Sequence, residues 1–206
     1  MSAARIPLFP LNVVLFPGQA VPLHIFELRY REMTRHCIDT QSCFGIVFLN
    51  DGKMARTGCS ALIVKTLKEY EDGRSDILTV GQSAFHLIRT HQEKLYFEAD
   101  VEYLEEDFTD ADPALSAQLE QLCNQCHQVL YGQDAPHFEA QAGNSLAYHV
   151  ASELPLDAEF RQSLLEVRSE VKRQQRLAAR LVEWLPQLRE RDRVRTKAGG
   201  NGHGKV

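Results

Sequence analysis

The residues with the clearest capacity for chemistry are Cys123, Cys126 and His127, in the run Cys-Asn-Gln-Cys-His. This spacing is used for c-type haem attachment, and a Cys-x-x-Cys pair also serves redox and zinc sites. Cys123 and Cys126 lie four residues after Leu119 and Leu122, which places both thiols on the apolar stripe of a predicted helix, where small buried cysteines pack well. A zinc site would need two further ligands at close spacing, and the chain supplies none locally. We therefore interpret both cysteines as core residues and predict no metal and no cofactor.

A second motif, formed by Gly199, Gly204 and Lys205, fits the first part of a phosphate-binding loop. Such a loop needs a strand before it, a helix whose N-terminus faces the phosphates, and a Ser or Thr for magnesium. Val206 stands where the hydroxyl residue would be. A hydrolase would need a nucleophile with a base in reach, and no Gly-x-Ser-x-Gly occurs. The sequence gives no positive reason to predict an enzyme.

Four polar residues near the N-terminus, His24, Glu27, Arg29 and Arg31, are the candidates for a binding site. His24 and Glu27 could form a pair, but they flank a predicted strand-to-helix junction that gives them no defined mutual geometry. We expect His24 to bond a backbone group and Glu27 to pair with Arg29 or Arg31. The Leu, Ile and Phe residues between them should be core, so these four are the members that could reach a groove.

The elements that must position these residues begin with a proline-punctuated apolar stretch over residues 6–31. Each proline fixes φ and removes a backbone donor, so no helix can run through the segment before residue 27. The prolines are Pro7, Pro10, Pro17 and Pro22. Strands that carry them should be edge strands, bulged strands or entry points to strands. The period then changes, and residues 27–38 are predicted to form a helix.

Short apolar or alternating runs, separated by turn signals, follow this helix. They cover residues 43–49, 58–71, 77–80, 84–88 and 95–104. Asp72 and Gly73 form a strong hairpin signal, and Gly81 favours a bulge or a sharp bend. About six strands with closely spaced turns predict a closed or nearly closed antiparallel barrel.

The second half of the chain reads as helices. Asp112 followed by Pro113 is a helix start, because a capping side chain precedes a proline at the first helical position. Three further helices are predicted: one over residues 145–153, one that begins at Asp157, and a last one that ends at Leu188. The end of the chain is charged and then glycine-rich, so we expect it to be disordered. The predicted parts are a barrel subdomain over 1–107, a helical subdomain over 108–190 and a disordered tail over 191–206.

Composition limits the partners. The formal net charge of -5 disfavours nucleic acid, whose binding depends on phosphate neutralisation by Lys and Arg. The basic run over residues 189–197 alternates with acids and lacks interleaved aromatics, so it favours a solvated helix end over an RNA-binding arm. No apolar run approaches the ~20 residues that span a bilayer. Five cysteines without a staple-like spacing, and no secretory signal, predict a reduced, cytoplasmic protein.

Two blocks of sequence resemble a known family. The first holds Pro-Leu-Phe-Pro-Leu at 7–11, Val-Leu-Phe-Pro-Gly at 14–18, Pro-Leu-His-Ile-Phe-Glu at 22–27 and Arg-Tyr-Arg-x-Met at 29–33. The second holds Leu-Pro-Leu at 154–156, Arg-Gln-x-Leu-Leu-Glu at 161–166, Arg-Leu at 176–177 and Leu181. They resemble the N-terminal substrate-binding domain of Lon proteases, and more closely the free-standing bacterial proteins that consist of that domain alone. The resemblance spans about residues 5–188.

The resemblance implies an α+β fold: a PUA-like β-barrel of about six strands with one helix, followed by a C-terminal helical bundle. It also implies a non-catalytic module that binds unfolded or degron-bearing polypeptides, or a partner protein. The binding surface would be an apolar groove between barrel and bundle, or a barrel edge at 43–49 or 95–104 that accepts an extended chain. The alternative is RNA binding, by analogy with other PUA-like barrels. A metal- or haem-dependent enzyme built on the Cys-x-x-Cys-His run is the third hypothesis.

Overall fold

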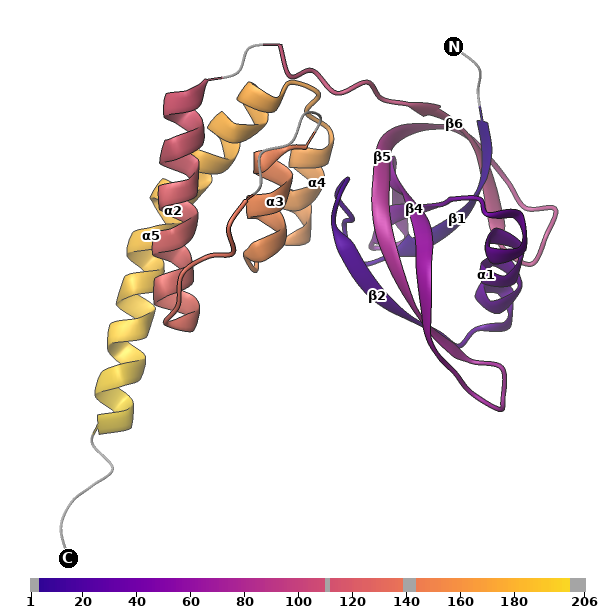
Figure 1. Ribbon diagram of the computed structural model, residues 1–206, viewed down its shortest axis with the longest axis horizontal. Helices are drawn as coiled ribbons and strands as arrows, with labels where there is room; N and C mark the ends of the chain where they lie inside the picture. Colours follow the sequence, from indigo (N-terminus) through magenta and orange to yellow (C-terminus); the bar gives the residue numbers. More distant parts are fainter. Residues whose placement is uncertain (1–3, 110–111, 139–143, 201–206) are drawn as a thin grey trace, which may run out of the picture. The chain divides into compact units, whose positions relative to one another are not determined.

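The structure is a computed structural model that describes residues 4–109, 112–138 and 144–200, with side chains to residue 194 (Figure 1). The chain forms two compact units. The first takes in the chain up to Glu106 together with Leu156–Arg168, and the second takes in Asp107–Pro155 and the chain from Ser169 onward. The helix that starts after Asp157 therefore groups with the strands, although the sequence placed it in the helical subdomain.

The first unit is built on a six-stranded sheet with one helix inserted after the second strand, as predicted. The elements are β1 Ala4–Leu11, β2 Ala20–Ile25, α1 Leu28–Thr40, β3 Phe44–Asn50, β4 Lys53–Glu69, β5 Ser75–His91 and β6 Phe97–Tyr103. The strand order is β2-β5-β4-β3-β1-β6, and β5 also pairs with β6. That additional pairing joins five strands into a ring and leaves β2 attached to the outside of β5. The sheet is mixed rather than antiparallel throughout, because β1 pairs with β3 in parallel.

The prolines of β1 lie on a strand that belongs to the ring, between β3 and β6, which corrects the prediction that they mark edge, bulged or entry strands. Pro7 lies opposite Glu98 of β6, whereas Pro10 lies opposite Val47 of β3. The two pairings overlap only at Leu8. Each proline thus has a paired neighbour on one side of the strand only. Its nitrogen, which has no hydrogen to donate, can face the other, unpaired side.

The two sheet edges suggested for chain pairing are both occupied. β3 is flanked by β1 and β4, and β6 is flanked by β1 and β5. Closure of the ring uses up these edges, as closure does in barrels generally. Unpaired strand edges include the outer edge of β2 and the distal half of β4. From Leu62 to Glu69, β4 pairs with β5 on one side, whereas its pairing with β3 ends at Ala61.

Strand β5 changes partner halfway along one edge. Its first part, Ser75–Val80, pairs with β2, and its last part, Phe85–His91, pairs with β6. Gly81 lies at the change, where the loop after β1 packs against it: the Gly18 N–H donates to the Gly81 carbonyl at 2.9 Å, and the Gly81 N–H donates to the Gln19 carbonyl at 2.9 Å. The β4–β5 register is irregular between Cys59 and Ala61, opposite this point. Of the bulge or sharp bend predicted at Gly81, this irregularity confirms the bulge.

The ring encloses a core of side chains from four strands. Its buried members are Ile6, Leu8, Val47, Phe85, Ala99 and Val101. The Phe85 ring occupies space that two glycines leave open: a Cβ on Gly45 or on Gly58 would lie 2.7 Å from the tip of that ring. Because side chains fill such an interior at crystal-like density, the ring is a packed body and not a pore.

Helix α4, Ala158–Leu165, joins the first unit through Arg161. Its Nη2 donates to the Val14 carbonyl at 3.1 Å and to Gln19 Oε1 at 2.9 Å. Its guanidinium lies 4.4 Å from the centre of the Phe16 ring. Burial lowers the pKa of Arg161 to about 10, so it stays charged at neutral pH. Next to it, Gln162 Nε2 donates to the Thr57 carbonyl of β4 at 3.0 Å.

The second unit consists of α2 Pro113–Tyr131, α3 Leu146–Glu153 and α5 Glu170–Gly200. A buried ion pair within α5 contacts the start of α3: Arg173 Nη1 lies 2.6 Å from Glu170 Oε2, and the same nitrogen donates at 3.1 Å to Oγ of Ser145, the N-cap of α3. The Arg173 guanidinium also lies 3.8 Å from the Tyr148 ring centre. With these additional partners, the charges are compensated inside the helical unit.

Helix α5 continues to Gly200, well past residue 190, where the sequence predicted the disordered tail to begin. Residues 191–200 are therefore helical, and the rest of the predicted tail lies outside the described residues. The run from Glu190 to Val194 is charged, and Arg193 lies 3.7 Å from Glu190 one turn before it. Such pairs between neighbouring turns support an exposed helix end that buries little apolar surface.

We expect Gly81→Ala to destabilise the protein by about 2–3 kcal/mol, because the added Cβ would lie 2.1 Å from the Phe16 carbonyl oxygen, a backbone atom that cannot rotate away. The matched control is Gly18→Ala in the same loop. Gly18 has a φ of +79° and nothing within 4 Å of an added Cβ, so it should lose only about 1 kcal/mol from backbone strain. Urea unfolding followed by circular dichroism measures both. Equal losses would contradict the close contact at Gly81.

We expect Arg161→Ala to lower the free energy of unfolding by about 2–3 kcal/mol, because two buried acceptors lose a charged donor. Arg161→Lys keeps the charge but cannot reproduce the planar fork, so it should recover only part of the loss. The same urea titration measures the series. Full recovery by lysine would show that charge alone, without the paired hydrogen bonds, holds α4 to the loop.

Candidate functional site

Two hollows of the first unit lie next to each other, between α1 and the distal part of the β4–β5 hairpin. Figure 1 shows α1 beside this hairpin. The first hollow, of about 460 Å³, is lined by Cys37 and Ile38 of α1, by Gln41 directly after that helix, and by residues 62–66 of β4. The second, of about 290 Å³, is lined by Arg31, Thr34, Arg35, Ile38, Asp39, Glu69, Tyr70, Gly73, Arg74 and Ser75. Ile38 lines both, so we treat them as one surface and call it the α1–hairpin groove.

A bulge in β4 shapes the apolar part of the groove. Ile63 pairs with Thr79 and Lys65 with Leu78, which leaves Val64 without a partner on β5. A bulge breaks the alternation of side chains along a strand and re-aims them. As a result, five consecutive residues, 62–66, can line the same hollow. Val64 is 49% exposed, and Ile38 across the groove is 45% exposed.

A second irregularity in the same strand has the same effect. Thr66 pairs with Ile77 and Lys68 with Asp76, so Leu67 is left out of the ladder. Leu67 is 48% exposed. Both residues that the ladder omits on this stretch are therefore apolar and half exposed, next to the unpaired edge of β4.

The groove as a whole has more basic than acidic lining residues. Among the lining residues, four are cationic, namely Arg31, Arg35, Lys65 and Arg74, and two are anionic, namely Asp39 and Glu69. The groove thus carries a positive balance in a chain whose formal net charge is -5. Local charge of one sign in a hollow raises the local concentration of opposite charge.

The hairpin turn orders two of these cations. Arg74 Nε lies 2.7 Å from Asp72 Oδ2, and the pKa of Asp72 is lowered, first by the hydrogen bond from the Arg74 backbone N–H and also by the charges of Arg74 and Arg31. Arg31 extends from α1 to the turn. Its guanidinium lies so close to Gly73 that a Cβ added there would overlap it. Gly73, with a φ of +82°, supplies the tight turn that leaves room for this side chain.

The predicted site residue His24 lies on β2, beside the hairpin. Its Nδ1 lies 2.5 Å from Asp76 Oδ1, so it bonds a carboxylate and not the backbone group that was predicted. Tyr70, which lines the groove, donates to the other oxygen of Asp76 at 2.8 Å. The pKa of Asp76 is lowered, first by the hydrogen bond with His24 and then by that of Tyr70. His24 thus positions a groove residue through Asp76.

The other three predicted residues are divided by the helix. Glu27 precedes α1 and lies 2.7 Å from Arg29 Nη2, which confirms that predicted ion pair. The Arg29 guanidinium lies 4.6 Å from the Tyr30 ring centre, and neither Glu27 nor Arg29 lines the groove. Arg31 does line it.

Sequence reasoning missed the remaining groove residues, above all Arg35, Ile38, Val64 and Tyr70. Ile38 continues the helical spacing of α1 and therefore looked like core, yet it is 45% exposed. Val64 follows two apolar residues in a strand and looked like core for the same reason. The alternation of charged and apolar residues after Val64 was the one available signal that this part of β4 leaves the ring.

The cysteine pair has no reactive geometry. Cys123 and Cys126 are buried in α2, which confirms the core interpretation. Burial raises the pKa of Cys123 to about 12 and that of Cys126 to about 11, so both thiols stay protonated at neutral pH. His127 is buried as well, and neither ring nitrogen has a hydrogen-bond partner among the described residues. Throughout the described residues, no group of three His, Cys, Asp or Glu side chains is placed to hold a metal ion.

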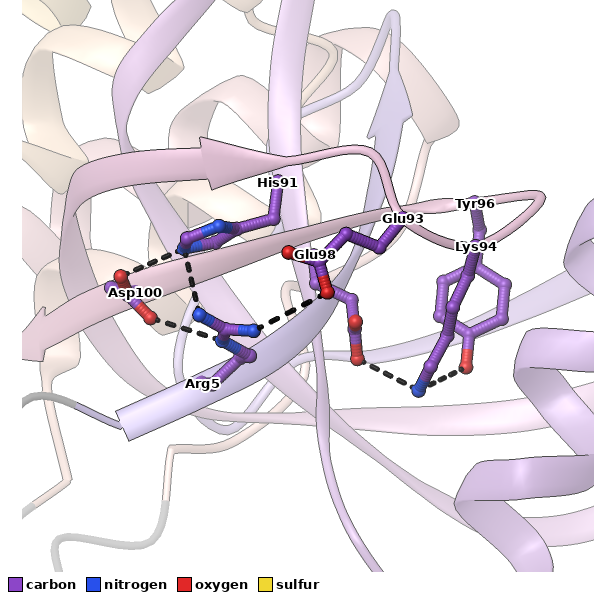
Figure 2. A network of polar contacts seen from close by, with 7 residues as sticks. All are labelled: Arg5, His91, Glu93, Lys94, Tyr96, Glu98 and Asp100. Carbon is purple, nitrogen blue, oxygen red and sulfur yellow. Dashed lines mark hydrogen bonds and ion pairs between the residues drawn. The ribbon is translucent and has the colours of Figure 1, made fainter.

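A separate polar network holds the ring closed where β1, β5 and β6 meet (Figure 2). His91 Nε2 lies 2.8 Å from Asp100 Oδ2, and Arg5 Nε donates to Asp100 Oδ1 at 3.3 Å. On the adjoining loop, Lys94 Nζ donates to Glu98 Oε1 at 2.9 Å and to the Tyr96 hydroxyl at 3.2 Å. Every charge in this network has an opposite charge as its neighbour, which is the pattern of a structural brace.

The described helices include none that is both long enough and apolar enough to cross a bilayer.

The protein therefore combines a mixed sheet closed into a ring, a second unit made of helices, and an open, partly basic groove on the sheet unit. The family model of the ATP-dependent protease La (LON) substrate-binding domain matches residues 5–183. The chain therefore belongs to this family.

Solved structures agree with this assignment. The Lon N-terminal domain protein from Xanthomonas campestris is 28% identical, with a TM-score of 0.68 over 85% of this chain and 98% of that chain. The N-terminal domain of Mycobacterium avium complex Lon protease is 14% identical, with a TM-score of 0.64 over 89% of this chain and 98% of that chain. The second likeness shows the fold alone. The family match and the first structure confirm the predicted family, and both structures agree with the predicted fold class.

A curated relative also matches over a shorter stretch. The protein cereblon of Xenopus tropicalis is 30% identical over 94 residues, which are 43% of this chain and 21% of that protein. The chain thus spans about a fifth of the length of this relative.

We expect part of the acid sensitivity of the protein to arise from Asp100. Its pKa is lowered, first by the hydrogen bond with His91 and then by that with Arg5. A carboxylate whose folded pKa lies below its unfolded value of about 3.9 stabilises the fold above that pH and loses the effect as the pH falls through the folded pKa. Asp100→Asn should therefore reduce the difference in unfolding free energy between neutral and acid pH.

Urea unfolding at about pH 7 and about pH 3 measures this difference. Glu71→Gln is the control, because it removes a carboxylate that lies in the hairpin turn, outside the network. An identical pH dependence in Asp100→Asn and in the wild type would show that the contact with His91 contributes nothing in solution.

Proposed function

We propose that this protein is a non-catalytic module that binds polypeptide chains. The observation that carries the proposal is the match to the LON substrate-binding domain over residues 5–183. The α1–hairpin groove supports it, because an open hollow with apolar and charged lining suits a flexible chain better than a small molecule, which pockets usually bury on most sides. The ligands we expect are unfolded or degron-bearing polypeptides, or a partner protein.

Binding without chemistry is the reading that the described side chains support. The buried thiols of α2 are protonated at neutral pH, and a nucleophile needs an activating base within reach. We propose that binding requires no nucleotide and that the protein works in the reducing conditions of the cytoplasm. All five cysteines, including Cys37, Cys43 and Cys59, are free thiols, which suits that setting.

RNA binding, as expected of some PUA-like barrels, is less well supported. Binding to single strands combines a positive groove with several aromatic side chains on which bases stack. The aromatic residue that lines the groove is Tyr70, and Lys68 and Arg74 already lie 4.5 and 5.0 Å from its ring centre. With a formal net charge of -5, the chain would also repel phosphates over long range.

The test is fluorescence anisotropy with labelled α-lactalbumin that has been reduced and carbamidomethylated, which keeps it unfolded and adds no charge. We expect saturable binding with a Kd of order micromolar, typical of a transient polypeptide contact. Native α-lactalbumin is the control for unfolded-chain selectivity, and a single-stranded RNA oligonucleotide tests the alternative. No binding of the unfolded protein up to about 100 µM, or tighter binding of the RNA, would overturn the proposal.

A further inference from the structure

We propose that the α1–hairpin groove is where the polypeptide docks, and that it selects extended segments in which an apolar side chain is flanked by acidic residues. The inference rests on the proposed function and adds to it the site and the ligand chemistry.

The apolar part of the ligand is read from the first hollow. Single exposed apolar residues are ordinary on protein surfaces, but here Ile38 and Val64 line the same hollow from opposite sides, at 45% and 49% exposure. Leu62 and Ile63 line it as well, each partly buried. An apolar side chain placed there would remove surface of all four residues from water, which is the main favourable contribution in such contacts.

The acidic part of the ligand is read from the cations around the hollow. Arg74 and Arg31 both act on Asp72 of the hairpin turn. Arg35 and Lys65 are exposed and lie outside that cluster, and within the described residues neither makes an ion pair. Lys65 lines the apolar hollow from β4, and Arg35 lines the adjoining second hollow from α1. Carboxylates next to the bound apolar side chain would meet these cations.

The groove's own acids, Asp39 and Glu69, limit how far the basic surface extends. Both line the second hollow, and the first hollow has Lys65 as its charged lining residue. Acidic groups of the ligand should therefore lie near Lys65 and Arg35, and not along the whole groove. This places the apolar and acidic parts of the ligand next to each other.

The extended conformation follows from the edge of β4. From Leu62 to Glu69 this strand has no partner on the side away from β5, over a length of roughly 26 Å at about 3.3 Å per residue. A chain lying beside an edge strand runs extended so that its backbone can pair with it. Bulges and lysines are devices that keep an edge from pairing along its whole length. Here they restrict main-chain pairing to short stretches, so selection depends on the side chains.

The same devices argue against a second copy of this chain as the occupant. Lys65 and Lys68 both lie on this edge, so pairing two β4 edges would bring like charges close together, and like charges on paired strands are destabilising. The positive balance of the groove instead favours an occupant of opposite charge. Self-association is therefore an outcome that the test must be able to detect.

The experiment compares three fluorescent ten-residue peptides that alternate valine with aspartate, with serine or with lysine. We expect the wild type to bind the aspartate peptide at least about tenfold more tightly than the lysine peptide, with a preference that weakens as salt is added. In the double variant Arg35→Glu with Lys65→Glu, the order should reverse. The control is Arg56→Glu with Arg89→Glu, which makes the same change in net charge at exposed positions outside the groove.

The apolar contact is tested separately. Val64→Ser should weaken the binding of all three peptides about fivefold or more, whereas Ile88→Ser, at a residue that is 58% exposed on β5 outside the groove, should not. Thermal unfolding of every variant checks that it folds. A fall in peptide binding without a fall in melting temperature assigns the effect to the groove.

Each result decides the matter. Reversal by the groove variant and not by its control supports the inference. If the wild type binds unfolded α-lactalbumin but the groove variants keep the wild-type peptide order and affinity, the inference is wrong and the proposed function stands. If the wild type binds neither the unfolded protein nor any peptide, both fail. If sedimentation shows a dimer that the groove variants abolish, the occupant is a second copy, and the inference is again wrong.

Discussion

The arrangement depends on one strand that serves two neighbours on the same edge. β5 gives its first part to β2 and its last part to β6, and the exchange happens at Gly81. No side chain can stand there, because a Cβ would lie 2.1 Å from the Phe16 carbonyl oxygen. The loop after β1 fills that space and bonds the Gly81 backbone on both sides. The contact between this loop and Gly81 therefore lies between the part of β5 that closes the ring and the part that extends into the hairpin.

The groove is a consequence of this exchange. The part of β5 that pairs with β2 lies outside the part that pairs with β6, so the β4–β5 hairpin continues beyond the ring. The pairing of β4 with β3 ends at Ala61. An unpaired edge next to α1 is the result. The brace of Arg5, His91 and Asp100 holds the ring side of β5, while Asp76 holds the hairpin side through His24 and Tyr70. These contacts hold both ends of the strand next to the surface that we propose to bind polypeptide.

Family membership and groove chemistry supply different parts of the functional argument. The match over residues 5–183 relates the chain to substrate-binding domains and supports a role in binding polypeptide. It does not say which segments are bound. The bulge at Val64 and the cations Arg35 and Lys65 belong to this chain's own sequence, and they carry the inferred preference for apolar residues with acidic neighbours.

The sequence alone determined the features that are encoded by residues close together in the chain. Asp112 caps α2 by accepting hydrogen bonds from the Ala114 and Leu115 N–H groups, the Asp72–Gly73 turn joins β4 to β5, and the Glu27–Arg29 pair forms as predicted. The two family blocks likewise indicated the fold class before any coordinates. Local chemistry was enough in each case, because caps, turns and short-range ion pairs need only neighbouring residues.

Only the tertiary structure decided the features that depend on pairing across long separations. It made β1 one of the ring strands, parallel to β3, and grouped α4 with the strand unit. It also paired His24 with Asp76, fifty-two residues away. It also exposed Ile38 and Val64, whose sequence context is that of core residues. The physical reason lies in where the neighbours of each strand end. Those end points decide which strand edge stays unpaired and which apolar side chain stays exposed to water, and no local sequence pattern encodes them.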